Sequence, residues 1–168
     1  EDGTTLRGAE IVQRVADEFS VNPRLLLAVL EYRSGWVSSE GKTGITEDYP
    51  LGLKDANRKG LYKQLSWAAN EMTRGYTLWE LSAVAVWTLS DGAVMRVDAT
   101  INGATAGIQY LLSLLLDKAE WKTAVSPDGF FAVYQRLFGF PFAFSIDPLI
   151  PETITQPQLT LPFAPGDT

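Results

Sequence analysis

Any catalysis by this protein must use carboxylates, Lys, Tyr, Ser or Thr, or a metal held by oxygens, because the sequence contains no His and no Cys. Imidazole bases, thiolate nucleophiles, disulfides and zinc fingers are therefore excluded. Glu31 follows an unbroken apolar run, residues 25–30. Burial in such surroundings penalises the charged form of a carboxyl group, raises its pKa and makes it a usable proton donor near neutral pH. Glu47 and Asp48 add two acids in a stretch interrupted by glycine and proline.

The segment that positions Glu31 reads as a complete helix. Asn22 is a good N-cap, and Pro23 suits the first helical position, where a missing N–H costs nothing. Gly35 is the expected C-terminal cap. A helix that is apolar on every side should run through the middle of a domain, and this one is too short to span a membrane.

The remaining pattern predicts a mainly α protein with about six helices around this buried one. Apolar residues recur at helical spacing in five further segments: 10–19, 61–76, 78–89, 104–116 and 128–138. Residues 36–53 predict an irregular glycine-rich loop or a small β-ribbon, and residues 94–97 a strand fragment or loop. Four tryptophans on the predicted helical faces are expected in the core: Trp67, Trp79, Trp87 and Trp121.

Length and composition predict one domain, residues 1–147, followed by a proline-rich tail or interdomain linker, residues 148–168. The net charge of −6 argues against a nucleic-acid partner, since such proteins are usually basic. We find no apolar stretch long enough for a transmembrane segment. The chain begins without Met, which favours a trimmed mature domain.

Two stretches carry a resemblance to a known family. Residues 15–28 (VADEFSVNPRLLLA) and Ser34-Gly35-Trp36 are similar to the opening of the lysozyme-like superfamily, in particular goose-type lysozymes and soluble lytic transglycosylases. Pro50-Leu51-Gly52-Leu53 stands where that family has a Gly-Leu-Met-Gln loop, and residues 104–111 resemble a later core helix. The resemblance implies a lysozyme-like helical domain that is secreted or in the cell envelope. It also implies a peptidoglycan-type partner, no cofactor or metal, and a further C-terminal domain in the full-length chain.

The implied activity is cleavage of a β-1,4-linked glycan by a carboxylic acid. Glu31 would be the general acid/base, and Glu47 or Asp48 would activate water in an inverting hydrolase, which needs a second carboxylate about 6.5–9.5 Å away. A lytic transglycosylase needs the single acid only. Four further residues are the expected substrate contacts: Tyr32, Ser34, Tyr49 and Asn102.

One departure from the family pattern leaves a second interpretation open. The family's catalytic Glu immediately precedes Ser-Gly, and here that position is Arg33, which has no proton to give. Glu31 lies two residues earlier, about 200° around a helix axis. Either Glu31 supplies the acid, or Glu31 is a structural carboxylate that pairs with an arginine or caps loop amides. In the second case the chain is a non-catalytic glycan-binding or accessory module of the same fold.

Overall fold

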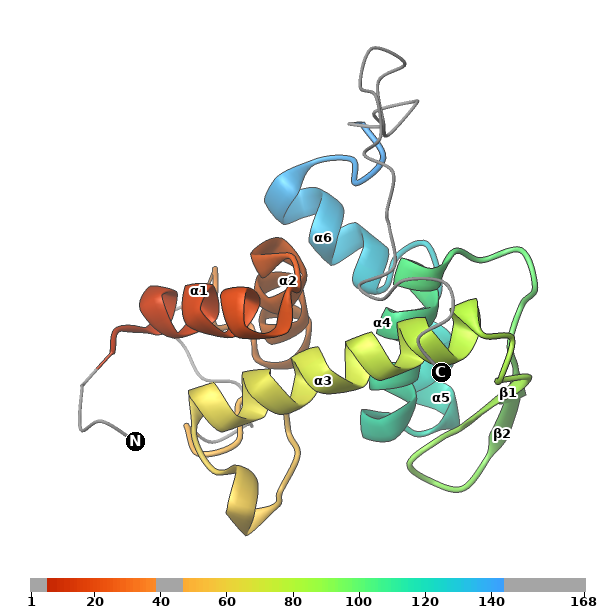
Figure 1. Cartoon of the computed structure of the whole chain (residues 1–168), viewed down its shortest axis with the longest axis horizontal. Helices are drawn as coiled ribbons and strands as arrows, with labels where there is room; N and C mark the ends of the chain where they lie inside the picture. The colour runs from red at the N-terminus through yellow and green to blue at the C-terminus, as the bar shows by residue number, and fades with distance from the viewer. Residues whose placement is uncertain (1–5, 39–46, 144–168) are drawn as a thin grey trace, which may run out of the picture.

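The computed structural model describes residues 6–38 and 47–143, and this part of the chain is mainly helical. The helices pack in crossing layers, with a two-stranded hairpin at one end (Figure 1). In chain order the elements are α1 (Gly8–Phe19), α2 (Pro23–Ser34), the 3₁₀ helix η1 (Ala56–Arg58), α3 (Leu61–Glu80), β1 (Val86–Thr88), β2 (Val94–Arg96), α4 (Gly103–Leu115), α5 (Lys118–Ala124) and α6 (Phe130–Phe138).

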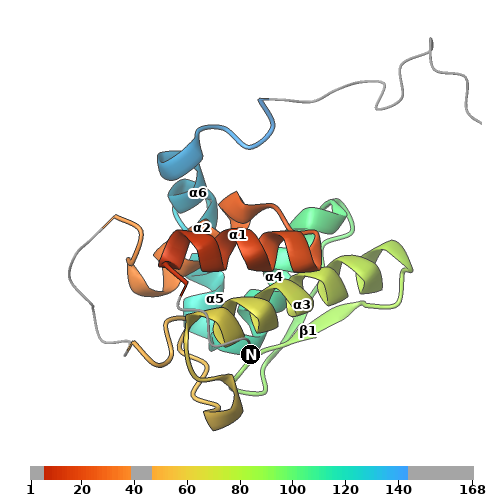
Figure 2. The same ribbon diagram turned by 60° about the vertical axis from the view of Figure 1, so that its left-hand side comes forward.

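The helix predicted between Asn22 and Gly35 is confirmed as α2, although Leu25 and Leu27 of its apolar run are only partly buried. The Asn22 side chain accepts a hydrogen bond from the Arg24 amide, and Gly35 ends the helix with a left-handed φ of 68°. Leu26, Ala28 and Val29 are fully buried. Helix α1 lies against α2 and α3, while α6 packs on another side of α2 (Figures 1 and 2). Helix α2 therefore lies between α1 and α6 and contacts both.

The long helix α3 corrects one prediction. We expected helices over residues 61–76 and 78–89, but α3 runs without a break from Leu61 to Glu80. Gly75 lies inside this helix because α4 approaches closely there: a Cβ at Gly75 would lie 3.0 Å from the Cα of Gly107. Gly75 is thus a packing position and not a helix end.

The β-ribbon also differs in place from the prediction. Strands β1 and β2 pair antiparallel, with Trp87 opposite Met95, so residues 86–88 are strand and not helix. Asp91 and Gly92 lie in the turn between the strands, and the Asp91 side chain accepts the Ala93 amide. In the predicted loop, the described residues 36–38 and 47–53 contain no strand, and residues 39–46 lie outside the described part.

The last three helices agree with the sequence in part. Asn102, predicted as a substrate contact, caps α4 by accepting from the Thr105 amide. The sequence pattern did not indicate the short helix α5, whose Asp117 and Glu120 form a capping box. Helix α6 begins at Phe130, two residues after the predicted start.

The described residues share one hydrophobic core that draws on all six α-helices and the hairpin. Trp67, Trp87 and Trp121 are buried there as predicted, and Trp79 is partly buried against the core. Among the described helices, none is long and apolar enough to cross a membrane. The predicted domain boundary at 147 and the tail 148–168 lie outside the described residues.

Candidate functional site

Glu31 sits at the end of α2 in a closed cluster of hydrogen-bond donors. Its carboxylate accepts from the backbone amides of Val37 and Ser38, at 3.0 and 3.1 Å, and from the Ser38 hydroxyl. The Arg136 Nη2 atom of α6 lies 2.8 Å from Glu31 Oε1. The Glu31 side chain is only 4% exposed, whereas that of Arg136 is 54% exposed. We call these four residues the Glu31 cluster.

The electrostatics of the cluster keep Glu31 ionised. Burial alone pushes the pKa of Glu31 up, but the Arg136 guanidinium, the Ser38 hydroxyl and the two backbone amides stabilise the anion and lower the pKa to about 2. The sequence predicts the opposite shift, because it does not reveal these donors. A carboxylate in this state does not carry the proton that a general acid must deliver near neutral pH. The geometry matches the structural alternative, in which Glu31 pairs with an arginine and caps loop amides.

The other two acids of the predicted catalytic set have different surroundings. Asp48 forms an ion pair with Lys59 at 2.9 Å, and its backbone oxygen accepts the Gly60 amide. Glu47 is exposed. No hydrogen bond or ion pair joins Glu31 to either acid among the interactions of residues 6–38 and 47–143. Their assignment as catalytic partners stays a prediction.

Arg33 faces the loop that follows the glycine-rich segment. Its Nε donates to the backbone oxygen of Leu51 at 3.0 Å, and Leu51 is fully buried. The guanidinium is partly buried, and desolvation lowers the pKa of Arg33, with Glu120 and Tyr32 acting in the opposite direction. Within the described residues, Arg33 forms no ion pair with a carboxylate.

The predicted substrate contacts divide into two groups. Ser34 is buried and donates to the Leu30 carbonyl, and Asn102 is the α4 cap, so both have a structural role. Tyr32 and Tyr49 are partly exposed, and burial raises the pKa of Tyr32. Tyr32 also packs edge-on against Phe130 of α6. Of the four residues, Ser34 is the one that is buried, whereas Tyr32 and Tyr49 are partly exposed and Asn102 is exposed.

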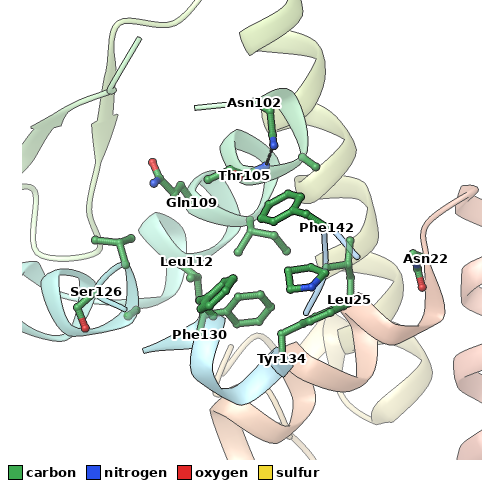
Figure 3. Close-up of a pocket in the computed structure, with 16 residues that line it drawn as sticks. Asn22, Leu25, Asn102, Thr105, Gln109, Leu112, Ser126, Phe130, Tyr134 and Phe142 are labelled. Carbon is green, nitrogen blue, oxygen red and sulfur yellow. Dashed lines mark hydrogen bonds between the residues drawn. The ribbon is translucent and has the colours of Figure 1, made fainter. Parts of the chain in front are cut away.

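A pocket of about 290 Å³ is lined by residues of α2, α4, α6 and the segment after α6 (Figure 3). Aromatic and aliphatic side chains dominate its walls, and no charged side chain lines it. Figure 3 shows Phe130, Tyr134 and Phe142 gathered around its centre, with Asn102 and Gln109 at the α4 side. The lining residues are Asn22, Leu25, Asn102, Ala104, Thr105, Ile108, Gln109, Leu112, Ala124, Val125, Ser126, Phe130, Phe131, Tyr134, Pro141 and Phe142.

Two residues that hold the site together, Arg136 and Gln64, were not predicted from the sequence. Arg136 is 105 positions from its partner Glu31, and only the packing of α6 on α2 brings them together. Gln64 is fully buried and holds the loop 51–58, donating to the carbonyls of Leu53 and Arg58 and accepting the Leu51 amide. The sequence signal for Gln64 was its position, as a polar residue, on the apolar face of α3. No sequence signal pointed to Arg136.

In the described part of the chain, no three acidic side chains lie close enough together to bind a metal ion. No curated protein and no solved structure matches the chain. A family model described as "LasA, N-terminal domain" matches residues 1–150, and the chain therefore belongs to the LasA N-terminal domain family.

Proposed function

We propose that this chain is a non-catalytic accessory module that recognises cell-wall glycan outside the cytoplasm. The observation that carries the proposal is the Glu31 cluster. Glu31 is the best-placed acid in the sequence, and the donors around it hold it as a buried anion. The residue therefore serves to fasten α6 and residues 37–38 to α2, and Glu31 in this state does not supply the protonated carboxyl group that glycoside cleavage requires.

Arg33 supplies the second argument. If the lysozyme-like resemblance reflects common descent, Arg33 occupies the position of the family's catalytic Glu and presents a cation there. Its Nε is engaged by Leu51, which leaves the outer nitrogens of the guanidinium for a ligand. A planar fork of N–H donors suits the hydroxyl and carboxylate oxygens of cell-wall glycans. Tyr32, whose ring is partly exposed, adds a flat surface beside it.

Membership of the LasA N-terminal domain family supports the proposed location outside the cytoplasm. The family suggests an extracellular protein, and its name describes a domain at the N-terminus of LasA. An accessory role beside another domain is consistent with that description. The glycan specificity follows from the lysozyme-like resemblance and from the arrangement of Arg33 and Tyr32.

The test combines binding and cleavage in one sample. The full chain is incubated with insoluble peptidoglycan, the pellet is assayed for bound protein, and the supernatant is analysed by mass spectrometry for released muropeptides. We expect the protein in the pellet and no release. Arg33→Met should weaken binding at least about tenfold, the loss of one good charged contact. Arg24→Met removes the same charge from the exposed face of the same helix and should bind as the wild type does.

The other outcomes decide between the alternatives. Released fragments with anhydro-muramic ends would indicate a lytic transglycosylase, and reducing ends a hydrolase; either result overturns the proposal. A protein that stays in the supernatant without cleaving anything would exclude glycan recognition altogether.

A further inference from the structure

The pocket lined by α6 is apolar at its buried end and polar at its rim. The buried end is formed by side chains that are at most 9% exposed: Leu112, Ala124 and Phe130. The rim carries Asn22 and Asn102, which are exposed. Figure 3 shows these two asparagines apart from Leu112 and Phe130. A molecule that matches the pocket therefore needs an apolar body and a polar end.

The volume of the pocket sets the size of the apolar body. The pocket holds about 290 Å³, roughly twice the ~150 Å³ of an engineered apolar cavity that accommodates benzene. Scaled from the six carbons of benzene, this space accommodates about ten to twelve carbons. No charged side chain lines the pocket, and a sugar would leave most of its hydroxyl groups there without a partner. A single hydrocarbon chain meets both conditions.

The asparagines at the rim favour a hydrogen-bond acceptor as the polar end of the ligand. The side-chain oxygen of Asn22 accepts the Arg24 amide, and that of Asn102 accepts the Thr105 amide. Both oxygens are thus engaged as helix caps. Within residues 6–38 and 47–143, the NH₂ groups of both side chains have no partner. The rim therefore offers hydrogen-bond donors to a ligand.

Arg24 adds a positive charge beside this rim. In the sequence it lies between Asn22 and Leu25, which both line the pocket. Its guanidinium is 5.8 Å from the ring centroid of Phe138, and that ring packs at 5.4 Å against Tyr134 of the pocket wall. No carboxylate of the described residues forms an ion pair with Arg24. A ligand carboxylate at the rim would therefore meet an unpaired cation as well as amide donors.

We propose that the pocket binds a free fatty acid of about ten to twelve carbons, with its chain between Leu112 and Phe130 and its carboxylate at Asn22 and Arg24. The proposal goes beyond glycan recognition, because neither Arg33 nor Tyr32 lines the pocket. Its consequence is that one domain can hold a fatty acid and a glycan at the same time.

The test varies the chain length and the head group of the ligand. Fatty acids from hexanoate to tetradecanoate, below their micelle concentrations, are titrated into the full, ¹⁵N-labelled chain and followed by NMR. We expect the amide signals of Ile108, Leu112 and Phe130 to shift. Affinity should rise about fourfold with each CH₂ group up to about twelve carbons and then level off. Decanol, which lacks the charge, should bind at least about tenfold more weakly than decanoate.

Two pairs of variants locate the chain and the carboxylate. Ala104→Phe adds a ring at an exposed lining position, the second residue of α4, and should abolish decanoate binding. Ala119→Phe, at the exposed second residue of α5 and outside the lining, is its control and should bind normally. Arg24→Met should weaken decanoate binding about tenfold and leave decanol binding unchanged. Lys63→Met removes an exposed charge from α3 and should change neither. Circular dichroism confirms the fold of each variant.

Three results would overturn the proposal. Equal affinities for decanoate and decanol would exclude a carboxylate at the rim. Signal shifts that lie outside the pocket, or that persist in Ala104→Phe, would mean that the fatty acid adsorbs elsewhere. Binding to phosphatidylglycerol vesicles that Ala104→Phe abolishes, without binding of free decanoate, would assign the pocket to a lipid surface instead.

Discussion

The carboxylate of Glu31 is buried, yet four donors surround it: two backbone amides, one hydroxyl and one guanidinium group. Desolvation raises the free energy of any buried charge, and hydrogen bonds to the charged form lower it again. Here the second effect is larger, so the pKa falls to about 2. Glu31 therefore accepts hydrogen bonds from residues 37 and 38 and from Arg136 of α6, and its role as a general acid stays a prediction.

This balance predicts how stability depends on pH. Because the folded pKa of Glu31 lies below its unfolded value of 4.5, the ionised carboxylate stabilises the fold at every pH above about 4.5, and this contribution is lost as the pH falls towards 2. A shift of that size corresponds to about 3 kcal/mol. Glu31→Gln should cost about that much at pH 7 and almost nothing at pH 2, as measured by urea unfolding. The difference between the two proteins should shrink steadily between these limits.

Glu18→Gln is the matched control. Glu18 also contacts an arginine at 2.8 Å, but Arg14 and Glu18 form an exposed i,i+4 pair on α1. Such exposed pairs are screened by solvent and contribute little to stability. An equal loss of stability in both variants would mean that burial and the loop amides do not matter at Glu31.

At the candidate site, some residues could be identified from the sequence and others could not. Glu31 and Arg33 were identified from their positions at the end of an apolar helix, because helix caps and apolar runs are local signals. Arg136 was not, because it meets Glu31 only after α6 has packed on α2. The direction of the Glu31 pKa shift depends on that long-range contact and therefore could not be read locally.

At the scale of elements, the contact between α3 and α4 is the most extensive in the described fold. Gly75 and Gly107 face each other across it, and both are buried. The small residues let the two backbones approach, which is why α3 continues through a residue that usually ends helices. Sequence patterns located the helices but misjudged Gly75, because a glycine at a C-cap and a glycine at a helix crossing look the same in one dimension.

Gly107→Ala tests this contact. In an open helix the change would stabilise the protein by up to about 1 kcal/mol. Here the new Cβ would lie 2.5 Å from the backbone oxygen of Met72, which cannot rotate away. The helices must separate, and we expect a net loss of about 2 kcal/mol, measured by thermal or urea unfolding. Gly8→Ala, at the start of α1, meets nothing closer than Leu61 Cδ2 at 3.9 Å and should change stability by less than about 0.5 kcal/mol. Equal effects in the two variants would exclude the close contact.

At the scale of the whole molecule, α6 stands apart from the other helices (Figure 1). It packs mainly on α2, while α3 has more extensive contacts with both α1 and α4. Its attachment combines the ion pair from Arg136 to Glu31 with the ring of Phe130 against Tyr32. The same helix forms one wall of the apolar pocket, so its attachment to α2 also shapes that site.

Hydrogen exchange can reveal whether α6 opens as a unit. Segments held by few buried contacts open at lower free energy than the core does. In Glu31→Gln, exchange of the amides from Tyr134 to Phe138 should accelerate, because the helix loses its ion pair with α2, while the buried amides of α3 and α4 keep their protection. Exchange is followed by mass spectrometry at pH 7, with Glu18→Gln as the reference. Uniform acceleration across all helices would show instead that the domain unfolds as one body and that the Glu31 cluster supports the whole core.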